Sequence, residues 1–353
     1  MPKPPKLGRL DLDRFTVFHD VSIDLSPQLN VVIGTNATGK SHLLKLAYAC
    51  LRSLVDRPPA GGELAPTKSR LKTVLSDNLR GTFRPDKLGR LATRQRGVNT
   101  ARVTAVLTNR SQLRFRFTTR SDSVDVLELP HEYLGPETQP VYLPTRELMS
   151  IYPGFAALYE STAVEFDQTW RDTCMLLGKP NVRGPRLEAA KALLGPLEIA
   201  LGGKVVIEND RFYLKSPRGK LEMHLVAEGL RKIATITQLV TNGTLINQGV
   251  LLWDEREANL NPQLIRRVAS VIVELAGQGT QVLIATHSSF LVRELEMALM
   301  TREDVIPRFV GLHRSAEDDD SVMVEVVEDS DDLQHFVSHE IEVEQADDIL
   351  GAM

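Results

Sequence analysis

A short glycine-rich segment near the start of the chain carries residues suited to phosphate chemistry. It fits the pattern G-x-x-x-x-G-K-[ST] and reads Gly34, Thr35, Asn36, Ala37, Thr38, Gly39, Lys40 and Ser41. Glycines let the backbone fold tightly round an oxyanion, so several N–H groups can point at one phosphate chain. Lys40 is then expected to reach the β- and γ-phosphates, and the Ser41 hydroxyl to bind Mg²⁺. The segment predicts nucleotide binding, and the alternative is a glycine-rich turn that fits by chance.

A pair of carboxylates follows an apolar segment late in the chain. Asp254 and Glu255 come directly after residues 250–253, which predict a buried strand. Ligands collect at the carboxyl ends of strands in such sheets, so both acids are expected at the phosphates. Asp254 is expected to hold Mg²⁺ directly or through water, because hard cations prefer oxygen ligands. Glu255 is expected to orient the attacking water or accept its proton, and the alternative is a surface turn.

A histidine ends the next predicted strand. His287 follows residues 282–286, and a neutral imidazole there can donate to a γ-phosphate or hold the attacking water. A lone histidine is usually structural. This histidine is a better candidate because its strand comes next after the carboxylate pair.

Hydrophobic periodicity predicts the elements that must position these residues. A buried strand over 29–33 precedes the glycine-rich loop, and a helix over 42–51 follows it with its positive dipole end at the phosphate. The other predicted strands, several of them in hairpins, lie within 10–25, 103–107, 113–118, 123–129, 141–143, 204–214, 221–225, 249–253, 281–285, 305–312 and 322–327. The other predicted helices cover 68–78, most of 145–201 with breaks at 152–154 and 178–180, 228–240, 261–275 and a segment from 289. This order predicts an α/β fold whose late strands lie beside the first in one mixed or parallel sheet.

Composition narrows the class of protein. The chain has 353 residues, is 42% hydrophobic and carries a net charge of −4, which suits a large core with more than one lobe. No apolar stretch of membrane-spanning length and no secretory h-region are present, so no membrane partner and a cytoplasmic location are expected. The two cysteines, Cys50 and Cys174, make no disulfide framework or metal set, and Cys50 is expected in the core.

Charge is unevenly distributed along the chain. Residues 66–120, the basic stretch, contain many Lys and Arg opposed only by Asp77 and Asp86, whereas residues 315–353 contain neither Lys nor Arg. One interpretation is a DNA- or RNA-binding surface that includes Arg84, Arg90 and Arg94. The alternatives are attraction between the basic stretch and the acidic tail, or a solvated surface.

Taken together, the motifs resemble those of ABC-type P-loop ATPases of the SMC, RecF and OLD-like group. The glycine-rich loop with its internal asparagine resembles Walker A, and residues 252–255 resemble Walker B with the catalytic glutamate. Residues 257–262 resemble the D-loop, and residues 286–288 resemble the switch histidine. Residues 226–232 lie where the signature motif belongs. The resemblance covers about residues 10–312 and implies an ABC-type head with a mixed central sheet, an antiparallel β lobe and a helical lobe.

The resemblance also implies an activity and partners. It implies an ATPase that uses ATP and Mg²⁺, with Lys40, Glu255 and His287 as catalytic residues and Glu228 and Gly229 at the nucleotide. It implies a head-to-tail dimer, in which ATP on one copy meets the signature of the other. By analogy, such a nucleotide-gated switch acts on nucleic acid or controls a separately encoded effector, as in anti-phage defence. The alternatives are an ATP-bound scaffold without turnover, a transporter ATPase subunit and, as the poorest fit, a GTPase.

The chain departs from the family pattern at two places. Ala227 occupies the signature serine position, so one hydroxyl contact to the partner's γ-phosphate would be missing. The Q-loop is not evident, although residues 145–147 lie near its expected place and Gln95 is a weaker option. These departures make ATP binding a firmer expectation than rapid hydrolysis.

Motif order divides the chain into four expected parts. Residues 1–143 are an N-terminal ATPase lobe with the phosphate loop and a basic β-rich insertion, and residues 144–225 are a helical insertion plus a hairpin. Residues 226–314 are a C-terminal ATPase lobe with the signature-like, Walker B and switch-histidine motifs, and residues 315–353 are an acidic tail.

Overall fold

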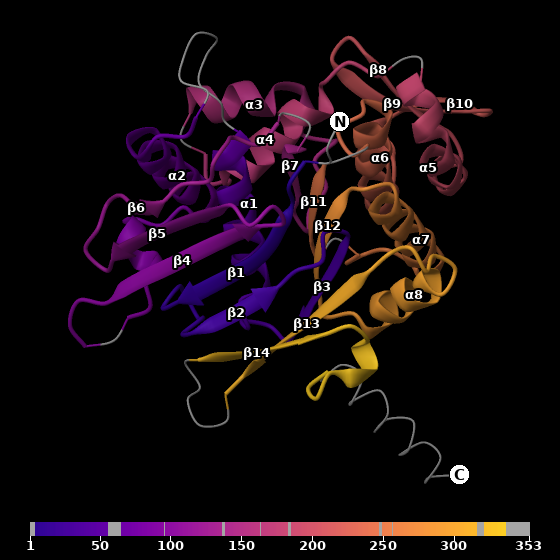
Figure 1. Ribbon diagram of the computed structural model, residues 1–353. Coiled ribbons are helices and arrows are strands. Elements are labelled where there is room, and N and C mark those ends of the chain that lie inside the picture. The colour runs from indigo at the N-terminus through magenta and orange to yellow at the C-terminus, as the bar shows by residue number, and fades with distance from the viewer. Residues whose placement is uncertain are drawn as a thin grey trace, which may run out of the picture. The chain divides into compact units, whose positions relative to one another are not determined.

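The chain forms two compact units, each built from segments that are distant in sequence. Figure 1 labels the helices and strands of the chain and colours them by residue number. The computed structural model describes residues 4–55, 65–94, 96–135, 138–162, 164–182, 185–246, 249–255, 257–315 and 321–336. Within these ranges, the phosphate-loop unit comprises residues 5–133, 283–293 and 306–336, and the carboxylate unit comprises residues 4, 134–282 and 294–305. The four-part division by motif order remains a prediction about functional segments, which need not coincide with compact units.

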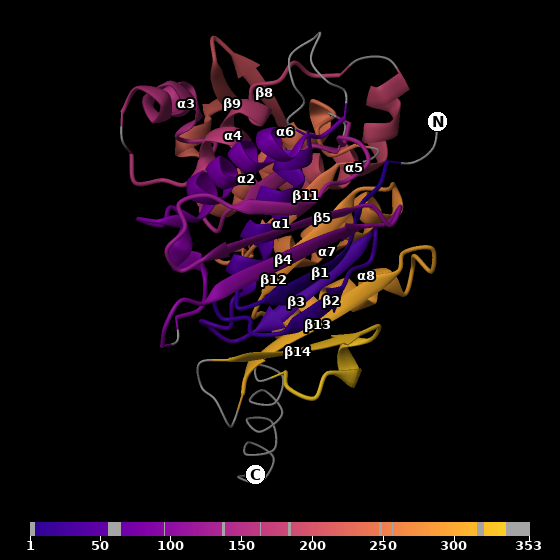
Figure 2. The same cartoon turned by 60° about the vertical axis from the view of Figure 1, so that its left-hand side comes forward.

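The phosphate-loop unit contains an antiparallel sheet with one buried face. Its strands are β1 (Leu7–Asp13), β2 (Val21–Asp24), β4 (Thr100–Leu107), β5 (Gln112–Thr118) and β6 (Asp125–Glu128). Their order is β2-β1-β4-β5-β6, and Figure 2 labels the first four of them. Buried and more exposed residues alternate along β4 and β5, as expected for strands with one face on a core. The hairpin predicted through Asn109 and Arg110 is confirmed, and Arg110 takes the left-handed conformation (φ 67°) that such turns require.

Two helices in the same unit lie near this sheet. Helix α1 (Lys40–Val55) packs against α2 (Lys68–Phe83), and α2 contacts β6. The Thr67 side chain caps α2 by accepting a hydrogen bond from the Arg70 N–H. Cys50 is fully buried in α1, and burial raises the pKa of its thiol to about 12, which confirms it as a core residue.

A mixed sheet completes the phosphate-loop unit. Strand β13 (Pro307–Arg314) runs parallel to β3 (Leu29–Gly34) and antiparallel to β14 (Val322–Val327), and β12 (Gln281–Thr286) lies on the other side of β3. Five of the six residues of β3 are fully buried, which explains why the sequence shows a nearly continuous apolar run there. The register places Leu312 opposite Gly34, the first residue of the glycine-rich loop.

The carboxylate unit holds the first part of β12 together with two further buried strands. Strand β11 (Val250–Asp254) pairs in parallel with β7 (Pro140–Leu143), and the Gln281 N–H at the start of β12 donates to the Gly249 carbonyl at 3.0 Å. Every residue of β7, β11 and β12 is buried. The predicted strands at 141–143, 249–253 and 281–285 are therefore confirmed to within one residue at each end.

Most of the helices in the described residues belong to the carboxylate unit. They are α3 (Tyr152–Ser161), α4 (Gln168–Leu177), α5 (Pro185–Leu201), α6 (Glu228–Thr241) and α7 (Pro262–Gly277), and α8 (Ser289–Leu299) begins in the phosphate-loop unit and ends here. The expected helix break at 152–154 is wrong, because α3 starts there with its proline in the first turn, where proline is favoured. The break at 178–180 is confirmed by the end of α4 at Gly178.

A small antiparallel sheet lies between α5 and α6 in the chain. Strands β8 (Lys204–Glu208), β9 (Arg211–Ser216) and β10 (Gly219–Glu222) form it in the order β10-β9-β8. Asn209 and Asp210 both have positive φ, as a two-residue type I′ turn demands, so this predicted hairpin is confirmed. The extended segment expected over 221–225 is correct only to Glu222, because Met223–Leu225 form a 3-10 turn.

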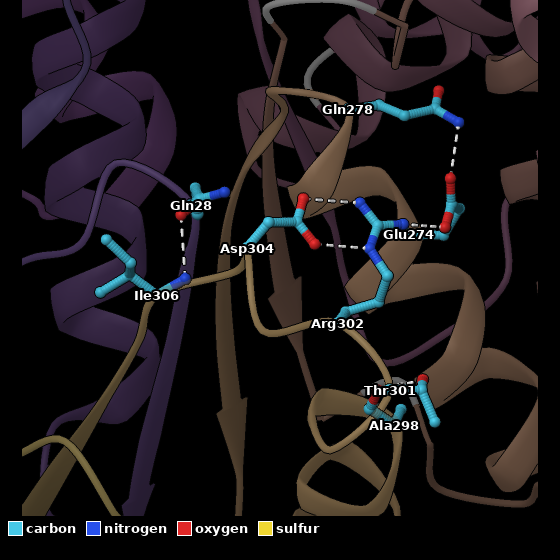
Figure 3. Close-up of polar contacts among 8 residues, drawn as sticks. All are labelled: Gln28, Glu274, Gln278, Ala298, Thr301, Arg302, Asp304 and Ile306. Atoms are coloured by element: carbon cyan, nitrogen blue, oxygen red, sulfur yellow. Dashed lines mark hydrogen bonds and ion pairs between the residues drawn. The ribbon is translucent and has the colours of Figure 1, made fainter.

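Arg302 ties the end of α7 to the chain after α8 (Figure 3). Its Nε and Nη2 donate to the two carboxylate oxygens of Asp304 at 2.8 and 3.0 Å, and its Nη1 contacts Glu274. Gln278 donates to the other oxygen of Glu274 at 2.9 Å. Separately, within the phosphate-loop unit, the Ile306 N–H donates to Gln28 Oε1 at 2.9 Å (Figure 3). In the part of the chain that the structure describes, no helix is both long and apolar enough to cross a membrane.

Candidate nucleotide-binding site

The glycine-rich loop connects the end of β3 to the start of α1. Ala37 (φ 63°) and Gly39 (φ 92°) both have left-handed backbones, which turn the chain sharply between the two elements. A Cβ atom at Gly39 would lie 2.7 Å from Val17 Cγ2 and 2.9 Å from Phe18 Cζ, so any larger residue would force this wall to move. A Cβ atom at Gly34 would lie 2.5 Å from the Leu312 carbonyl oxygen. Both glycines of the pattern are therefore needed for the shape of the loop.

The Lys40 side chain folds back onto the first residues of the glycine-rich loop. Its ammonium group donates to the carbonyl oxygens of Gly34 at 2.8 Å and Thr35 at 2.9 Å, and the residue is only 5% exposed. The Thr38 hydroxyl donates to the Thr35 carbonyl at 2.9 Å, and the Leu43 N–H donates to the Gly39 carbonyl, which starts the α1 ladder. A positive group and a helix N-terminus thus converge on one loop, which is the arrangement that favours a bound phosphate.

The remaining loop residues differ in exposure. Thr35, Asn36 and Ala37 are exposed, whereas Ser41 in the first turn of α1 is half-buried. The exposed tip leaves backbone N–H groups of the loop within reach of a ligand from solvent. The sequence prediction of strand, loop and helix is confirmed here as geometry, and the role of each residue at a nucleotide remains a proposal.

His287 lies at the turn between β12 and α8 in the phosphate-loop unit. It is exposed, although Thr286 before it is buried. The Ser288 N–H donates to the Thr286 hydroxyl at 2.9 Å, and the Ser288 hydroxyl accepts from the Leu291 N–H at 3.2 Å. These bonds fix the turn as the N-terminal cap of α8, so the position of the histidine backbone is well defined.

In the carboxylate unit, Asp254 ends β11 and has a tyrosine partner. Its side chain is 8% exposed, and the Tyr142 hydroxyl donates to its Oδ2 at 2.6 Å. Burial, and after it the charge and hydrogen bond of Asp254, raise the pKa of the Tyr142 hydroxyl well above its usual value. Sequence reasoning missed Tyr142. The available signal was a phenol within a fully buried strand, since a buried hydroxyl must find a hydrogen-bond partner.

Glu255 has a left-handed backbone with φ of 44°. This conformation is uncommon for a residue with a side chain and costs on the order of 1 kcal/mol or more. The residue is half-buried, directly after the strand. Strain of this kind is concentrated at functional sites because the surroundings must hold it in place, so the outlier supports Glu255 as a functional residue.

The signature-like segment forms the start of α6. Ala227 is the N-cap residue of α6. It makes no side-chain hydrogen bond to the helix, because alanine has no hydroxyl group. Two residues further on, a Cβ atom at Gly229 would lie 3.2 Å from the Asn259 carbonyl oxygen, which is tighter than most real contacts. A cavity of about 430 Å³ opens here and is lined among others by Ala227, Gly229, Asn259 and Arg267. The segment that resembles the signature and the one that resembles the D-loop thus share one concave surface.

Lys232 joins these two segments and was also missed from the sequence. It is 1% exposed, although it is a lysine, and its ammonium donates to the Ala258 carbonyl at 2.5 Å and lies 3.8 Å from Glu228. A buried ammonium group must be paired, so this contact links the first turns of α6 to the segment after Walker B. No periodicity signal could have distinguished this lysine from the exposed ones on α6.

Residues 145–147, the candidate Q-loop, make side-chain contacts with both the Walker B strand β11 and helix α6. The Thr145 hydroxyl donates to the Asp254 carbonyl at 3.3 Å. The buried Glu147 pairs with Arg231 Nε at 2.9 Å and accepts the Ser150 N–H at 3.1 Å. The segment contacts both β11 and α6, as a Q-loop is expected to do, but it contains no glutamine. The weaker candidate, Gln95, lies outside the described residues.

A glycine-rich loop between a buried strand and a helix, with a second buried strand that ends in carboxylates, defines the P-loop nucleotide-binding class. Family models agree: residues 6–84 match an AAA domain, and residues 183–293 match the "AAA domain, putative AbiEii toxin, Type IV TA system". A curated relative, the DNA replication and repair protein RecF of Ligilactobacillus salivarius (strain UCC118), is 48% identical over 42 residues. That match spans 12% of this chain and only 11% of the relative.

Solved structures share the fold over nearly the whole chain. An SMC head bound to the C-terminal winged-helix domain of ScpA superposes with a TM-score of 0.55 and 14% identity, covering 93% of this chain and 99% of that one. The SMC head with an extended coiled coil bound to the C-terminal domain of ScpA, from Pyrococcus furiosus, gives 0.53 and 12% identity, covering 99% of both chains. These findings support an ABC-type P-loop ATPase of the SMC/RecF group, and they confirm the expected α/β head with its mixed sheet.

Proposed function

We propose that this protein binds ATP with Mg²⁺, hydrolyses it, and uses the cycle as a nucleotide-gated switch. The observation that carries the proposal is the position of Lys40, whose ammonium closes the glycine-rich loop by bonding to the Gly34 and Thr35 carbonyls. A triphosphate entering the loop offers this ammonium stronger, charged acceptors than neutral carbonyls. Lys40 then contacts the β- and γ-phosphates, while N–H groups of residues 34–41 surround the phosphate chain.

The other residues supply the metal and the water. Ser41 and Asp254 hold Mg²⁺, whose preference is for hydroxyl and carboxylate oxygens. Glu255 accepts a proton from the attacking water or orients it, and His287 contacts the γ-phosphate. When bound, Mg²⁺ neutralises charge that develops on the transferring phosphoryl group. Support comes from the strained Glu255 backbone and from the hydrogen bond that orients Asp254.

The signature-like surface is proposed to meet ATP on a second copy in a head-to-tail dimer. The α6 N-terminus, with Glu228 and Gly229 in its first turn, borders the concave surface shared with the D-loop-like segment. Ala227 cannot donate a hydroxyl, so phosphate contact there depends on backbone N–H groups and the helix dipole. Closure of the dimer would be driven by this contact and released after hydrolysis.

One observation favours an alternative, a scaffold that holds ATP without turning it over. The missing hydroxyl at Ala227 removes a contact that would stabilise the transition state. Turnover by the wild-type protein separates the alternatives: ATP binding without phosphate release would support the scaffold and contradict the ATPase.

The experiment for the catalytic assignment compares Glu255→Gln with Glu303→Gln, an exposed glutamate outside the site. Glu255→Gln is expected to lower the single-turnover rate by roughly 10²- to 10⁴-fold with ATP affinity retained, because a general base is removed. Glu303→Gln is expected to match the wild type. An undiminished rate in Glu255→Gln would contradict the role assigned to this residue.

We further propose that the basic stretch contacts nucleic acid. The observed ion pairs show which of its arginines are already opposed by acids. Arg102 pairs with Asp13 at 2.7 Å and Arg116 with Asp125 at 3.0 Å, so acids from outside the stretch oppose two of its arginines. Arg90 pairs with Asp86 at 3.0 Å. The proposed contact centres on Arg84, Lys87, Arg94 and Arg96 because these residues are exposed, and it includes Arg90, whose exposed ion pair a phosphate could displace.

Salt dependence tests this contact. Reversal of Arg84, Arg90 and Arg94 to glutamate is expected to weaken DNA or RNA binding and to lower the salt slope by about one for each phosphate that the protein no longer neutralises. The matched control reverses three exposed basic residues of the β8-β9-β10 sheet region, Arg211, Lys215 and Arg218, with the same change in charge. Equal weakening in both variants would show a nonspecific charge effect and contradict a site in the basic stretch.

By analogy with the group, the switch controls nucleic-acid transactions or a separately encoded effector, in anti-phage defence. The similarities that bear on this role are to a toxin-system family model and to a replication and repair protein. Loss of protection against phage in a strain carrying Lys40→Ala, with protection by the wild type, would support the defence role. Equal plaque counts with and without the wild-type protein would contradict it.

A further inference from the structure

Two histidines and a glutamate meet at the edge of the mixed sheet, away from the glycine-rich loop in sequence and unused by the proposed ATPase. His313 lies on β13, Glu325 on β14, and His335 follows the 3-10 turn Ser330–Asp332. All three belong to the phosphate-loop unit. We call them the His-Glu-His cluster.

The side chains of the cluster lie near one another, with ligand atoms somewhat farther apart than in a metal-bound site. One ligand atom from each residue lies within 4.8 Å of the other two, and His313 Nδ1 is 3.7 Å from Glu325 Oε1. The His313 and His335 rings are 4.3 Å apart between centroids. Two ligands about 2.0–2.1 Å from a tetrahedral ion lie about 3.3 Å from each other, so the ligand atoms would have to approach one another by roughly 0.4 to 1.5 Å to share one ion.

A buried nitrogen in the cluster lacks a hydrogen-bond partner. His313 Nδ1 is shielded from solvent and bonds to no described residue, and the nearby Glu325 oxygen is too far away for a hydrogen bond. An unsatisfied buried polar atom is costly, and native structures rarely keep one without a reason. The nitrogen faces the Glu325 carboxylate, as expected for two ligands of one ion.

The surroundings hold two of the ligands in place. Glu325 uses its second oxygen, Oε2, to accept the Gln334 N–H at 2.9 Å, which leaves Oε1 directed at His313. Leu333 packs over Gly311, where an added Cβ would come within 2.9 Å of its Cδ2. The segment that carries His335 is thus already docked on β13 and β14. Outer contacts of this kind orient the ligands of metal sites.

We propose that His313, Glu325 and His335 bind one zinc ion, which fastens residues 330–336 to strands β13 and β14. Imidazole nitrogens and a carboxylate suit zinc and similar transition metals, whereas Mg²⁺ prefers an all-oxygen set. Three protein ligands leave a fourth position for water. Bound zinc would join the last described segment to the sheet that contains β3.

Zinc binding to the nucleotide-free, chelator-treated full chain tests the proposal. The wild type is expected to bind one equivalent of zinc by calorimetry and to melt at a higher temperature with zinc than with the same concentration of Mg²⁺. His335→Ala and Glu325→Gln are each expected to weaken zinc binding by more than about ten-fold. His335 is exposed, so its replacement should leave the fold intact, which circular dichroism will check.

The matched control is His131→Ala, an exposed histidine outside the cluster, which is expected to bind zinc as the wild type does. Failure of the wild type to bind zinc would overturn the proposal. The proposal would also be overturned if His335→Ala and Glu325→Gln each bound one equivalent of zinc with wild-type affinity, because zinc would then bind elsewhere. Weakening by His131→Ala equal to that by His335→Ala would overturn it as well.

Discussion

The Tyr142 hydroxyl donates a 2.6 Å hydrogen bond to Oδ2 of Asp254, from a neighbouring parallel strand of the carboxylate unit. Both residues are nearly fully buried, where water weakens a hydrogen bond to a carboxylate little. The bond restrains the orientation of the Asp254 carboxylate. Tyr142 is therefore a positioning residue for the proposed Mg²⁺ ligand.

Replacement of Tyr142 by phenylalanine tests this positioning. Tyr142→Phe is expected to reduce the gain in ATP affinity caused by Mg²⁺ by about ten-fold, because contacts behind a metal ligand tune its affinity by such factors. ATP affinity without Mg²⁺ should remain unchanged. Calorimetric titrations with and without Mg²⁺ measure both quantities.

The control removes a hydroxyl that orients nothing. Tyr133 is buried, and its hydroxyl has no hydrogen-bond partner among the described residues, so Tyr133→Phe should leave the Mg²⁺ effect as it is. If Tyr142→Phe also retains the full Mg²⁺ effect, Asp254 does not need the phenol for its orientation.

Substitutions at Gly277 and Arg302 are expected to have non-additive effects on the free energy of unfolding. A Cβ atom at Gly277 would overlap the Arg302 guanidinium, which Asp304 and Glu274 hold in place (Figure 3). Gly277→Ala is therefore expected to destabilise the wild type by about 1 kcal/mol, by displacing a bidentate ion pair. In an Arg302→Ala background, the same change is expected to stabilise by about 0.5 kcal/mol, because alanine suits a helix better than glycine.

Chemical denaturation of the four proteins in this double-mutant cycle gives the coupling energy. Arg302→Lys should not restore stability fully, since an ammonium cannot make the two parallel bonds to Asp304. Additive effects of Gly277→Ala and Arg302→Ala would mean that the guanidinium moves aside without cost.

Lys6 is expected to make the free energy of unfolding depend on pH in the alkaline range. Burial lowers the pKa of its ammonium from 10.5 to about 8. Between these values the unfolded chain binds the proton and the folded chain does not, so this residue makes the free energy of unfolding rise with pH. Below about pH 8 the folded state carries the cost of a buried charge.

Replacement of Lys6 by methionine should remove both effects. Lys6→Met is expected to stabilise the protein at pH 7 by about 1 to 3 kcal/mol, with the advantage fading as pH rises toward about 10.5. Lys72→Met, an exposed lysine on α2, serves as the control and should follow the wild type. A stability difference between Lys6→Met and the wild type that stays constant from about pH 7 to 10.5 would contradict the assignment.

Elements with strong periodicity or turn chemistry could be predicted from the sequence. The buried strand before the glycine-rich loop, the hairpin at Asn209 and Asp210, and the helix that starts after Asn261 are all confirmed, and Asn261 indeed caps α7 by accepting the Leu264 N–H. Each of these depends on residues close together in the chain, so local patterns were sufficient.

Contacts between distant segments could not be predicted. Tyr142 reaches Asp254 across 112 residues, and Lys232 reaches Ala258 across 26, because the strands and helices that carry them pack together. The expected break at 152–154 failed for a local reason, since proline and glycine suit a helix start as well as a helix end. The ion pairs of Arg102 and Arg116 likewise depend on strand pairing, which the charge count could not show.

The central claim is that the loop of residues 34–41 binds ATP through Lys40, and direct titration with labelled ATP and Mg²⁺ tests it. Lys40→Ala is expected to weaken ATP binding by at least about 100-fold, because a charged partner of the phosphates is removed. Lys45→Ala, a change of the same kind on the same helix α1, should bind ATP as the wild type does. Wild-type affinity in Lys40→Ala, with the fold intact, would contradict the account.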